Sequence, residues 1–299
     1  MSGTPLMLKP LSSDVAENTY EVIIAELGLK DASVEERIHR LTSISPEELV
    51  EKTPMTARLA PFLDDDVLPK AITFETLASG VDIPGIKWCE ELMLGDCQHD
   101  GNVTFFMGLA SRVQNLAPTL YTSFSASLGA ATATAVLEAY GIGPNTSDDV
   151  ALQSTIYLAT DIVYAAPALS FARAWSGKTY AYHFNEGNPW DGQFKGMATH
   201  MLDAAFLFQN YNERMNKGAK VVAQEFARAF LAFVNGIGPW KDFEEDENVK
   251  AFGGGEVDHM VRSNEWGNGR RDMLFRLAEE GKVDLYVLSV AWDEFLAGH

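Results

Sequence analysis

The chain has 299 residues, with 23 Lys+Arg against 42 Asp+Glu, a formal charge of −19 and 46% hydrophobic residues. So negative a chain, without a basic cluster, is a poor match for nucleic acid or an anionic membrane surface, because both bind clustered cations. The composition also argues against a disordered chain, because enough apolar residues are present to fill a core.

We expect no membrane span, because Asp161, Arg173 or Gln209 interrupts the apolar stretches. The N-terminus lacks the basic start and long apolar stretch of a signal peptide. Cys89 and Cys97 are too few for a disulfide framework, although one bond between them is compatible with their number. These features favour a cytoplasmic location.

Two segments near the N-terminus, 33–36 and 45–48, have the pattern of a helix start. Each places a serine before the helix and a glutamate three residues later, which is the pattern of a capping box. In the first of these helices Val34, Ile38 and Leu41 recur at helical spacing, so we expect one apolar stripe to be buried.

Two segments, 88–94 and 178–184, have the composition of strands and are each followed by a polar loop. About eighty residues of helical pattern separate them, including 155–175, which suits a crossover between parallel strands. An α/β fold with a mostly parallel sheet flanked by helices is therefore predicted. The glycines at 253–255 follow no predicted strand, so we do not interpret them as a dinucleotide-binding motif.

Ligand sites in parallel sheets form beyond the carboxyl ends of strands, so the loops after residues 94 and 184 are the first candidates. The first loop contains Asp100 and the second leads to His200. A carboxylate that orients an imidazole is the arrangement that acyl transfer requires. Purely structural roles for both residues stay open, as does a metal site of His200 and Asp203 joined by His99 and Asp100, which lacks any metal-binding motif.

Six segments in a fixed order resemble one family. The chain resembles the C-terminal half of the type-B carboxylesterases, the cholinesterase-like branch of the α/β-hydrolases, from about Pro54 almost to its end. The segments are Thr53-Pro54-Met55 through Phe62 to Pro69, Leu94-Gly95 through Asp100-Gly101, Thr160-Asp161 through Pro167, Tyr180 to Phe184, Thr199-His200 through Phe208, and Phe226 through Gly238-Pro239-Trp240.

The resemblance implies that Asp100 is the acid of a Ser-His-acid triad and that His200 is the general base. It places Asp203 beside that base, as a supporting residue at most, and helix capping is the alternative role for Asp203. Trp190, Phe206 and Phe208 are candidates for the substrate side, and core packing is the alternative for all three.

The family's serine lies on a Gly-x-Ser-x-Gly elbow upstream of the acid and the histidine. This sequence contains no such elbow; Ser123, Ser125 and Ser127, followed by Gly129, come nearest, but they lie between acid and base. We therefore expect an incomplete α/β-hydrolase fold over 1–299, without its first strands and with one sheet edge exposed.

Two hypotheses follow. In the first, the chain is part of a carboxylic-ester hydrolase with a small-molecule ester as substrate, and it acts with an N-terminal half or as a homo-oligomer that covers the sheet edge. In the second, it is a non-catalytic binding module or a truncated product derived from that family. Neither hypothesis requires a cofactor or a metal.

Overall fold

The computed structural model of the chain describes residues 6, 9–54, 57–81, 83–243, 246–265 and 269–298. The chain forms two compact units: a small unit of Leu8–Ile72, and a main unit of Met1–Met7 with Thr73–His299. Met55, in the first of the family-like segments, lies outside the described residues. That residues 1–299 form a single carboxylesterase-like region stays a prediction.

The small unit has three helices, α1 (Ser13–Glu26), α2 (Val34–Ser43) and α3 (Pro46–Lys52). Both expected helix starts are confirmed. The Ser33 hydroxyl accepts a hydrogen bond from the Glu36 backbone N–H, and the Glu36 carboxylate accepts one from the Ser33 backbone N–H. Ser45 accepts a hydrogen bond from the Glu48 N–H, but the Glu48 carboxylate pairs with Arg40, so only the first segment forms the full capping box.

The expected burial of the α2 stripe is wrong. Val34 is 66% exposed and Ile38 is 57% exposed. The physical reason is that the described part of this unit builds almost no core, since Ile24 of α1 is its one buried hydrophobic residue. The capping signal depends only on neighbouring residues, and the structure confirms it. Burial of the stripe would need a second apolar surface, which the described part of this unit does not provide.

The main unit is built on a four-stranded sheet in the order β1-β2-β3-β4. Strands β1 and β2 pair in parallel over their whole length, as the sequence predicts. The second strand has its predicted limits, but the first begins and ends three residues later than expected: Trp88 lies in a turn and is 80% exposed, and the strand continues to Cys97. The strands are β1 (Glu91–Cys97), β2 (Lys178–Phe184), β3 (Asn248–Phe252) and β4 (Asp258–Arg262).

Strands β3 and β4 are not predicted from the sequence, and they correct the interpretation of the glycine triplet. β3 pairs in parallel with β2 and antiparallel with β4, so a strand does precede Gly253. Gly253, Gly254 and Gly255 all have positive φ, at 79°, 81° and 108°, and form the turn between the two strands. The triplet therefore serves as a hairpin connection, for which glycine is the residue of least strain.

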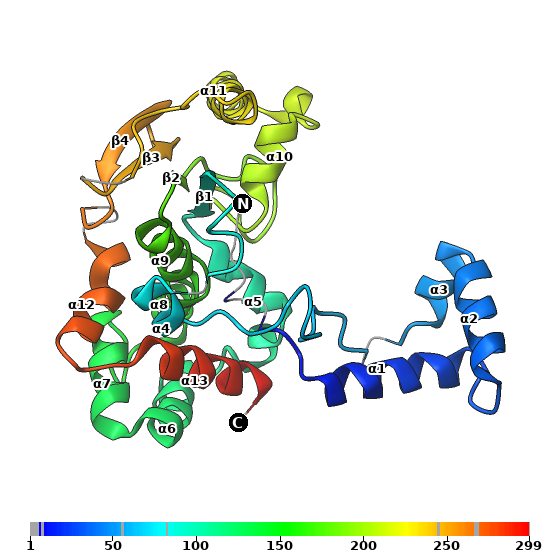
Figure 1. Ribbon diagram of the computed structural model, residues 1–299. Coiled ribbons are helices and arrows are strands. Elements are labelled where there is room, and N and C mark those ends of the chain that lie inside the picture. The colour runs from blue at the N-terminus through cyan, green and yellow to red at the C-terminus, as the bar shows by residue number, and fades with distance from the viewer. Residues whose placement is uncertain are drawn as a thin grey trace. The chain divides into compact units, whose positions relative to one another are not determined.

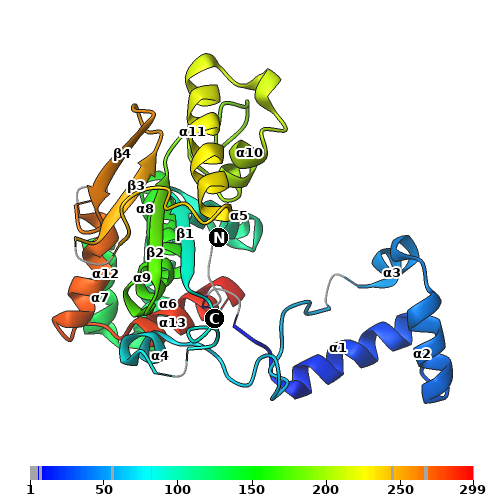
Figure 2. The same cartoon turned by 45° about the horizontal axis from the view of Figure 1, so that its top comes forward.

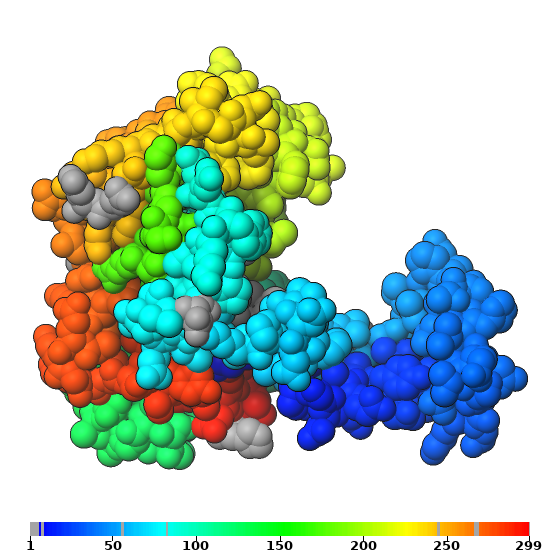
Figure 3. All heavy atoms as spheres, viewed as in Figure 1, coloured from blue at the N-terminus to red at the C-terminus, as the bar shows by residue number. Residues whose placement is uncertain are grey.

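Helices cover both faces of the sheet, giving three layers (Figures 1 and 2). On one face Tyr180, Tyr182 and Phe184 of β2 pack in a cluster with residues of α10 (Leu202–Phe208) and α11 (Lys217–Val234). In the space-filling view α11, in yellow, lies directly against α10 (Figure 3). On the other face Ala181 packs against α9 (Ala166–Ala174). The alternation of β2 side chains thus sets the two cores.

The crossover between β1 and β2 contains a continuous helical stretch, Asp148–Ala174. It consists of α8 (Asp148–Thr160), a π-helical turn η3 (Asp161–Ala165) and α9. By length and hydropathy this stretch could cross a membrane, so the expectation that Asp161 and Arg173 interrupt the apolar sequence enough to exclude a span is wrong. Its most apolar window, however, is 78% buried inside the described structure. It is therefore a core helix in this fold.

The remaining elements of the main unit complete its helical layers and connections. Among them, α11 buries Val222 and Phe226, and Phe230 and Phe233 pack partly buried against the same cluster. The other helices are α4 (Phe74–Ser79), α5 (Val103–Phe106), α6 (Leu116–Leu128), α7 (Ala130–Ala139), α12 (Met273–Glu279) and α13 (Leu285–Ala297), and the short 3-10 turns are η1 (Asp100–Asn102), η2 (Leu109–Arg112), η4 (Asn212–Arg214) and η5 (Arg270–Asp272).

Gly95 permits the close approach of β1 to β2. A Cβ at this position would lie 2.3 Å from the backbone oxygen of Tyr182, the residue that it faces in register. Because a backbone atom cannot rotate away, we expect Gly95→Ala to lower the free energy of unfolding of the main unit by about 3 kcal/mol. Urea unfolding followed by tryptophan fluorescence measures this, since all six tryptophans belong to the main unit.

Gly143→Ala is the matched control. A Cβ there would meet its nearest atom, Thr146 Oγ1, at an ordinary 3.7 Å. Its free energy of unfolding should stay within about 1 kcal/mol of the unmodified chain. Equal stability of the two variants would show that the approach of β1 to β2 is not tight.

Candidate functional site

The structure brings Asp100 and His200 together, although 100 positions separate them in the sequence. Asp100 lies in η1 directly after β1, and His200 lies in the loop between β2 and α10. Asp100 Oδ1 is 2.8 Å from His200 Nδ1, which is a hydrogen bond. The two side chains therefore meet beyond the carboxyl ends of two adjacent parallel strands, where such sheets form their ligand sites.

Backbone and side-chain hydrogen bonds hold the two loops together. The His99 N–H donates to the Ala198 carbonyl oxygen over 2.9 Å, and His99 and Thr199 form a short parallel bridge. The His200 N–H donates to Asn102 Oδ1 over 2.9 Å. The backbones that carry acid and base are thus fixed to each other independently of the Asp100–His200 hydrogen bond itself.

The Asp100 carboxylate is fully buried, and both of its oxygens have partners. Oδ1 faces His200, and Oδ2 accepts a hydrogen bond from the Cys97 N–H over 2.6 Å. The next residue, Gly101, donates its N–H to Thr160 Oγ1 over 2.9 Å. A Cβ on Gly101 would lie 2.3 Å from the Ile156 carbonyl oxygen, so glycine lets this turn pack directly on α8.

The hydrogen bond to Asp100 determines which nitrogen of His200 is the base. With the proton on Nδ1 donated to the carboxylate, Nε2 carries the lone pair that can accept a proton. The His200 side chain is 18% exposed, and Nε2 hydrogen-bonds to none of the residues that the structure describes. The Tyr164 ring packs beside the imidazole, with the two centroids 5.0 Å apart.

Burial raises the pKa of Asp100 to about 6, and the neighbouring Asp96 and Asp203 carboxylates add to this rise. The hydrogen bond from His200 opposes it. Burial also lowers the pKa of the adjacent His99 to about 4, and the positive charges of Arg270 and Arg271 act in the same direction. His99 is therefore neutral at pH 7.

Asp203 occupies a supporting position in the first turn of α10. Its Oδ2 accepts a hydrogen bond from the Tyr182 hydroxyl over 2.9 Å, and its Oδ1 accepts one from the Ala204 N–H over 2.8 Å. Asp203 thus connects the helix after His200 to strand β2. The residue before α10 is Met201, with φ of 67° in the left-handed region, and the Asp203 carboxylate satisfies the Ala204 N–H of the first helical turn.

The three aromatic candidates for the substrate side occupy different places. Phe206 is fully buried and packs against Phe184, their centroids 5.0 Å apart, so it belongs to the core. Trp190 is partly buried and contacts Tyr211 edge to face. Phe208 is 69% exposed. Of the three, Phe206 is placed where a ligand could not reach it.

Asn102, Tyr164 and the Cys97 N–H also contact the pair, and the sequence does not predict them as site residues. Asn102 carries a local signal, because it lies two residues after the acid and in the same loop. Tyr164 has none, since it comes from the crossover helix and reaches His200 only through the fold. A backbone N–H such as that of Cys97 has no side-chain signature at all.

The other candidates from the sequence do not join this site. Ser127 lies on α6 and donates its hydroxyl to Glu294 of α13 over 2.5 Å. Cys89 and Cys97 are free thiols. Within the described ranges, no group of three or more His, Cys, Asp or Glu side chains could hold a metal ion.

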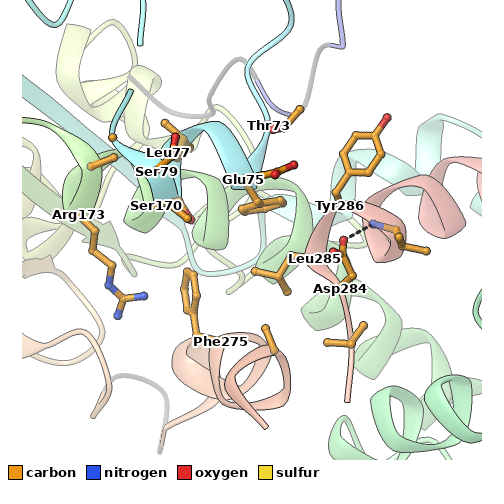
Figure 4. Close-up of a pocket in the computed structure, with 17 residues that line it drawn as sticks. Thr73, Glu75, Leu77, Ser79, Ser170, Arg173, Phe275, Asp284, Leu285 and Tyr286 are labelled. Atoms are coloured by element: carbon orange, nitrogen blue, oxygen red, sulfur yellow. Dashed lines mark hydrogen bonds between the residues drawn. The ribbon is translucent and has the colours of Figure 1, made fainter. Parts of the chain in front are cut away.

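A cavity of about 730 Å³ lies elsewhere in the main unit (Figure 4). It is lined by α4, the end of α9, α12 and the start of α13, and Arg173 and Phe275 lie on one side of it. Neither Asp100 nor His200 lines it. The Arg173 guanidinium stacks on Phe275 at 4.3 Å and pairs with Glu247, so its charge is already balanced.

The structure is similar to solved structures of esterases, which confirms the expected α/β-hydrolase fold. Two structures of PNB esterase match with TM-scores of 0.56 and 0.58 at 17% and 20% identity, over 90% and 91% of this chain. Carboxylesterase Est55 of Geobacillus stearothermophilus matches with a TM-score of 0.57 at 18% identity over 88% of this chain. No family model and no curated protein matches the sequence.

This chain spans 60% and 59% of the PNB esterase chains and 55% of the Est55 chain. The similarity therefore concerns a little over half of each esterase. At this level of identity it establishes the fold, and the fold alone leaves the activity to be argued from the site.

The raised pKa of Asp100 predicts a pH-dependent effect on stability. The folded chain keeps this proton up to about pH 6, whereas the ordinary pKa is 3.8, so ionisation between these values costs folded stability. Asn at position 100 has no proton to lose. We expect Asp100→Asn to match the unmodified chain below pH 4 and to gain up to about 3 kcal/mol above pH 6.

Urea unfolding of the main unit at pH 4 and pH 7.5 measures this difference. Asp31→Asn, at an exposed position of the small unit, is the control and should show no such dependence. An Asp100→Asn variant that is equally destabilised at both pH values would mean that the carboxylate is ionised throughout.

Proposed function

We propose that this chain supplies the acid and the base of a carboxylic-ester hydrolase whose serine comes from outside these 299 residues. The hydrogen bond between Asp100 Oδ1 and His200 Nδ1 supports this proposal most strongly. It selects the tautomer in which Nε2 is basic, and the exposed part of His200 leaves room for a reacting group. The fold shared with PNB esterase and Est55 agrees with the same chemistry.

In the proposed reaction, His200 Nε2 takes the proton of the serine hydroxyl while the serine oxygen attacks the ester carbonyl. Asp100 stabilises the resulting imidazolium. His200 then returns the proton to the departing alcohol, which leaves an acyl-serine. A water molecule, deprotonated by the same nitrogen, attacks this acyl group and releases the carboxylic acid and the free serine.

A second function, a non-catalytic binding module, is favoured by a different observation. The sequence contains no Gly-x-Ser-x-Gly elbow, and oxyanion-hole donors normally accompany that elbow. Without both, an acid and histidine pair lacks the largest electrostatic contribution to ester hydrolysis. The two functions differ in whether supplying the elbow produces activity.

A fusion protein tests the proposal. In it, the N-terminal part of PNB esterase that this chain does not cover, with its elbow serine, precedes the full chain of 299 residues. We expect hydrolysis of p-nitrophenyl acetate at least about 100-fold faster than by this chain alone, because serine, base and acid are then complete. His200→Ala and Asp100→Asn in the fusion should each remove most of that gain.

His39→Ala in the fusion is the matched histidine control, because His39 lies on α2 in the small unit. It should leave the gain in rate unchanged, whereas His200→Ala should remove most of it. A monodisperse, folded fusion without activity would favour the binding module. Full activity in a His200→Ala fusion would remove the site assignment.

A further inference from the structure

A buried network of opposite charges lies directly behind the proposed acid. Asp96 Oδ2 is 2.6 Å from Arg271 Nη1, and the same Nη1 is 3.0 Å from Asp161 Oδ1. Arg270 also pairs with Asp161, and the Tyr140 hydroxyl donates to Asp161 Oδ2 over 2.8 Å. Two carboxylates and two guanidinium groups thus balance one another inside the main unit, and Asp96, Asp161 and Arg271 are almost fully buried.

Asp96 also connects the two strands of the site. It faces His183 in the β1–β2 register, and its Oδ1 hydrogen-bonds to His183 Nδ1. Burial lowers the pKa of His183 and the Asp96 charge opposes this, so the imidazole is neutral at pH 7. Burial alone would raise the pKa of Asp96, but Arg271, His183 and Arg270 together outweigh burial, so the pKa of this carboxyl lies below its ordinary value.

The network reaches the acid through one residue, Cys97. The Cys97 carbonyl oxygen accepts a hydrogen bond from Arg271 Nη2 over 3.4 Å. The Cys97 N–H, on the peptide unit shared with Asp96, donates to Asp100 Oδ2 over 2.6 Å. Arg271 therefore contacts the Cys97 carbonyl oxygen directly and also pairs with the side chain of Asp96, the residue before Cys97.

We propose that Asp96 is a positioning residue: held between His183 and Arg271, it fixes the end of β1 so that the Cys97 N–H points at Asp100 and sets the orientation of that carboxylate toward His200. This inference rests on the proposed function of the Asp100–His200 pair. Asp96 itself touches no reacting group, because it is buried behind the pair.

A purely structural network is the alternative, because a buried ion pair that loses one partner destabilises any fold. The positioning role makes an additional demand, which is that the effect be local. Disturbing Asp96 must loosen the Cys97 N–H and the Asp100–His200 hydrogen bond more than it loosens the rest of the sheet. Site-resolved measurements on the full chain separate these cases without any substrate or serine.

The test compares Asp96→Asn with the unmodified chain by NMR. We expect the Cys97 amide to exchange with solvent at least tenfold faster in the variant, while amides of β3 change less than threefold. The Nδ1–H proton of His200 should give a strongly downfield signal in the unmodified chain and a broadened or upfield-shifted signal in the variant.

Glu247→Gln is the matched control, since Glu247 also pairs with an arginine, Arg173, over 2.8 Å, away from β1. It should leave both readouts at Cys97 and His200 unchanged. A folded Asp96→Asn chain with unaltered readouts would overturn the proposal. So would a Glu247→Gln chain that shows the same changes, because the effect would then be a general loss of stability.

Arg271→Lys is the second variant, and it keeps the charge while removing the fork that contacts both Asp96 and Cys97. It should accelerate Cys97 amide exchange in the same direction. If neither variant folds while Glu247→Gln does, the network is required for folding itself, and the proposal of a positioning role fails. Because these outcomes involve no hydrolysis, they are independent of the activity of the serine-bearing fusion.

Discussion

The carboxyl end of β1 depends on the compensation of buried negative charge. Asp96, Asp100 and Asp203 all lie in the interior around Cys97. Arg271 pairs with Asp96, His200 donates a hydrogen bond to Asp100, and the Tyr182 hydroxyl donates one to Asp203. Since isolated charges are expensive to bury, the fold can hold this arrangement only while each carboxylate keeps its partner. The geometry of the site and the stability of the sheet are therefore linked.

Local signals in the sequence predict the local features of this fold. The serine caps at 33 and 45 and the strand 178–184 are indicated by neighbouring residues, and the structure has all of them. Strands β3 and β4 are only five residues each, too short for a clear signal in the sequence, and they are defined by their pairing, β3 beside β2 and β4 beside β3. The exposed stripe of α2 shows the converse, because periodicity indicates an apolar face but not the surface that covers it.

The two central residues of the site can be predicted from the sequence, whereas the residues that hold them cannot. Asp100 and His200 stand on loops after strands, and the family resemblance selects them from the other acids and histidines of the chain. The contacts that hold them come from distant segments: Thr160 and Tyr164 from the crossover helix, and Arg271 from the turn before α12. No spacing rule connects these positions, since they meet only when the sheet and its helices are assembled.

The deep burial of Asp100 also restricts the surroundings in which the pair could work. An acidic compartment or medium, well below pH 6, would protonate this carboxyl group and deprive the imidazole of its negative partner. Protonation would leave the hydrogen bond between the two side chains possible but would remove the negative charge that can stabilise an imidazolium at His200.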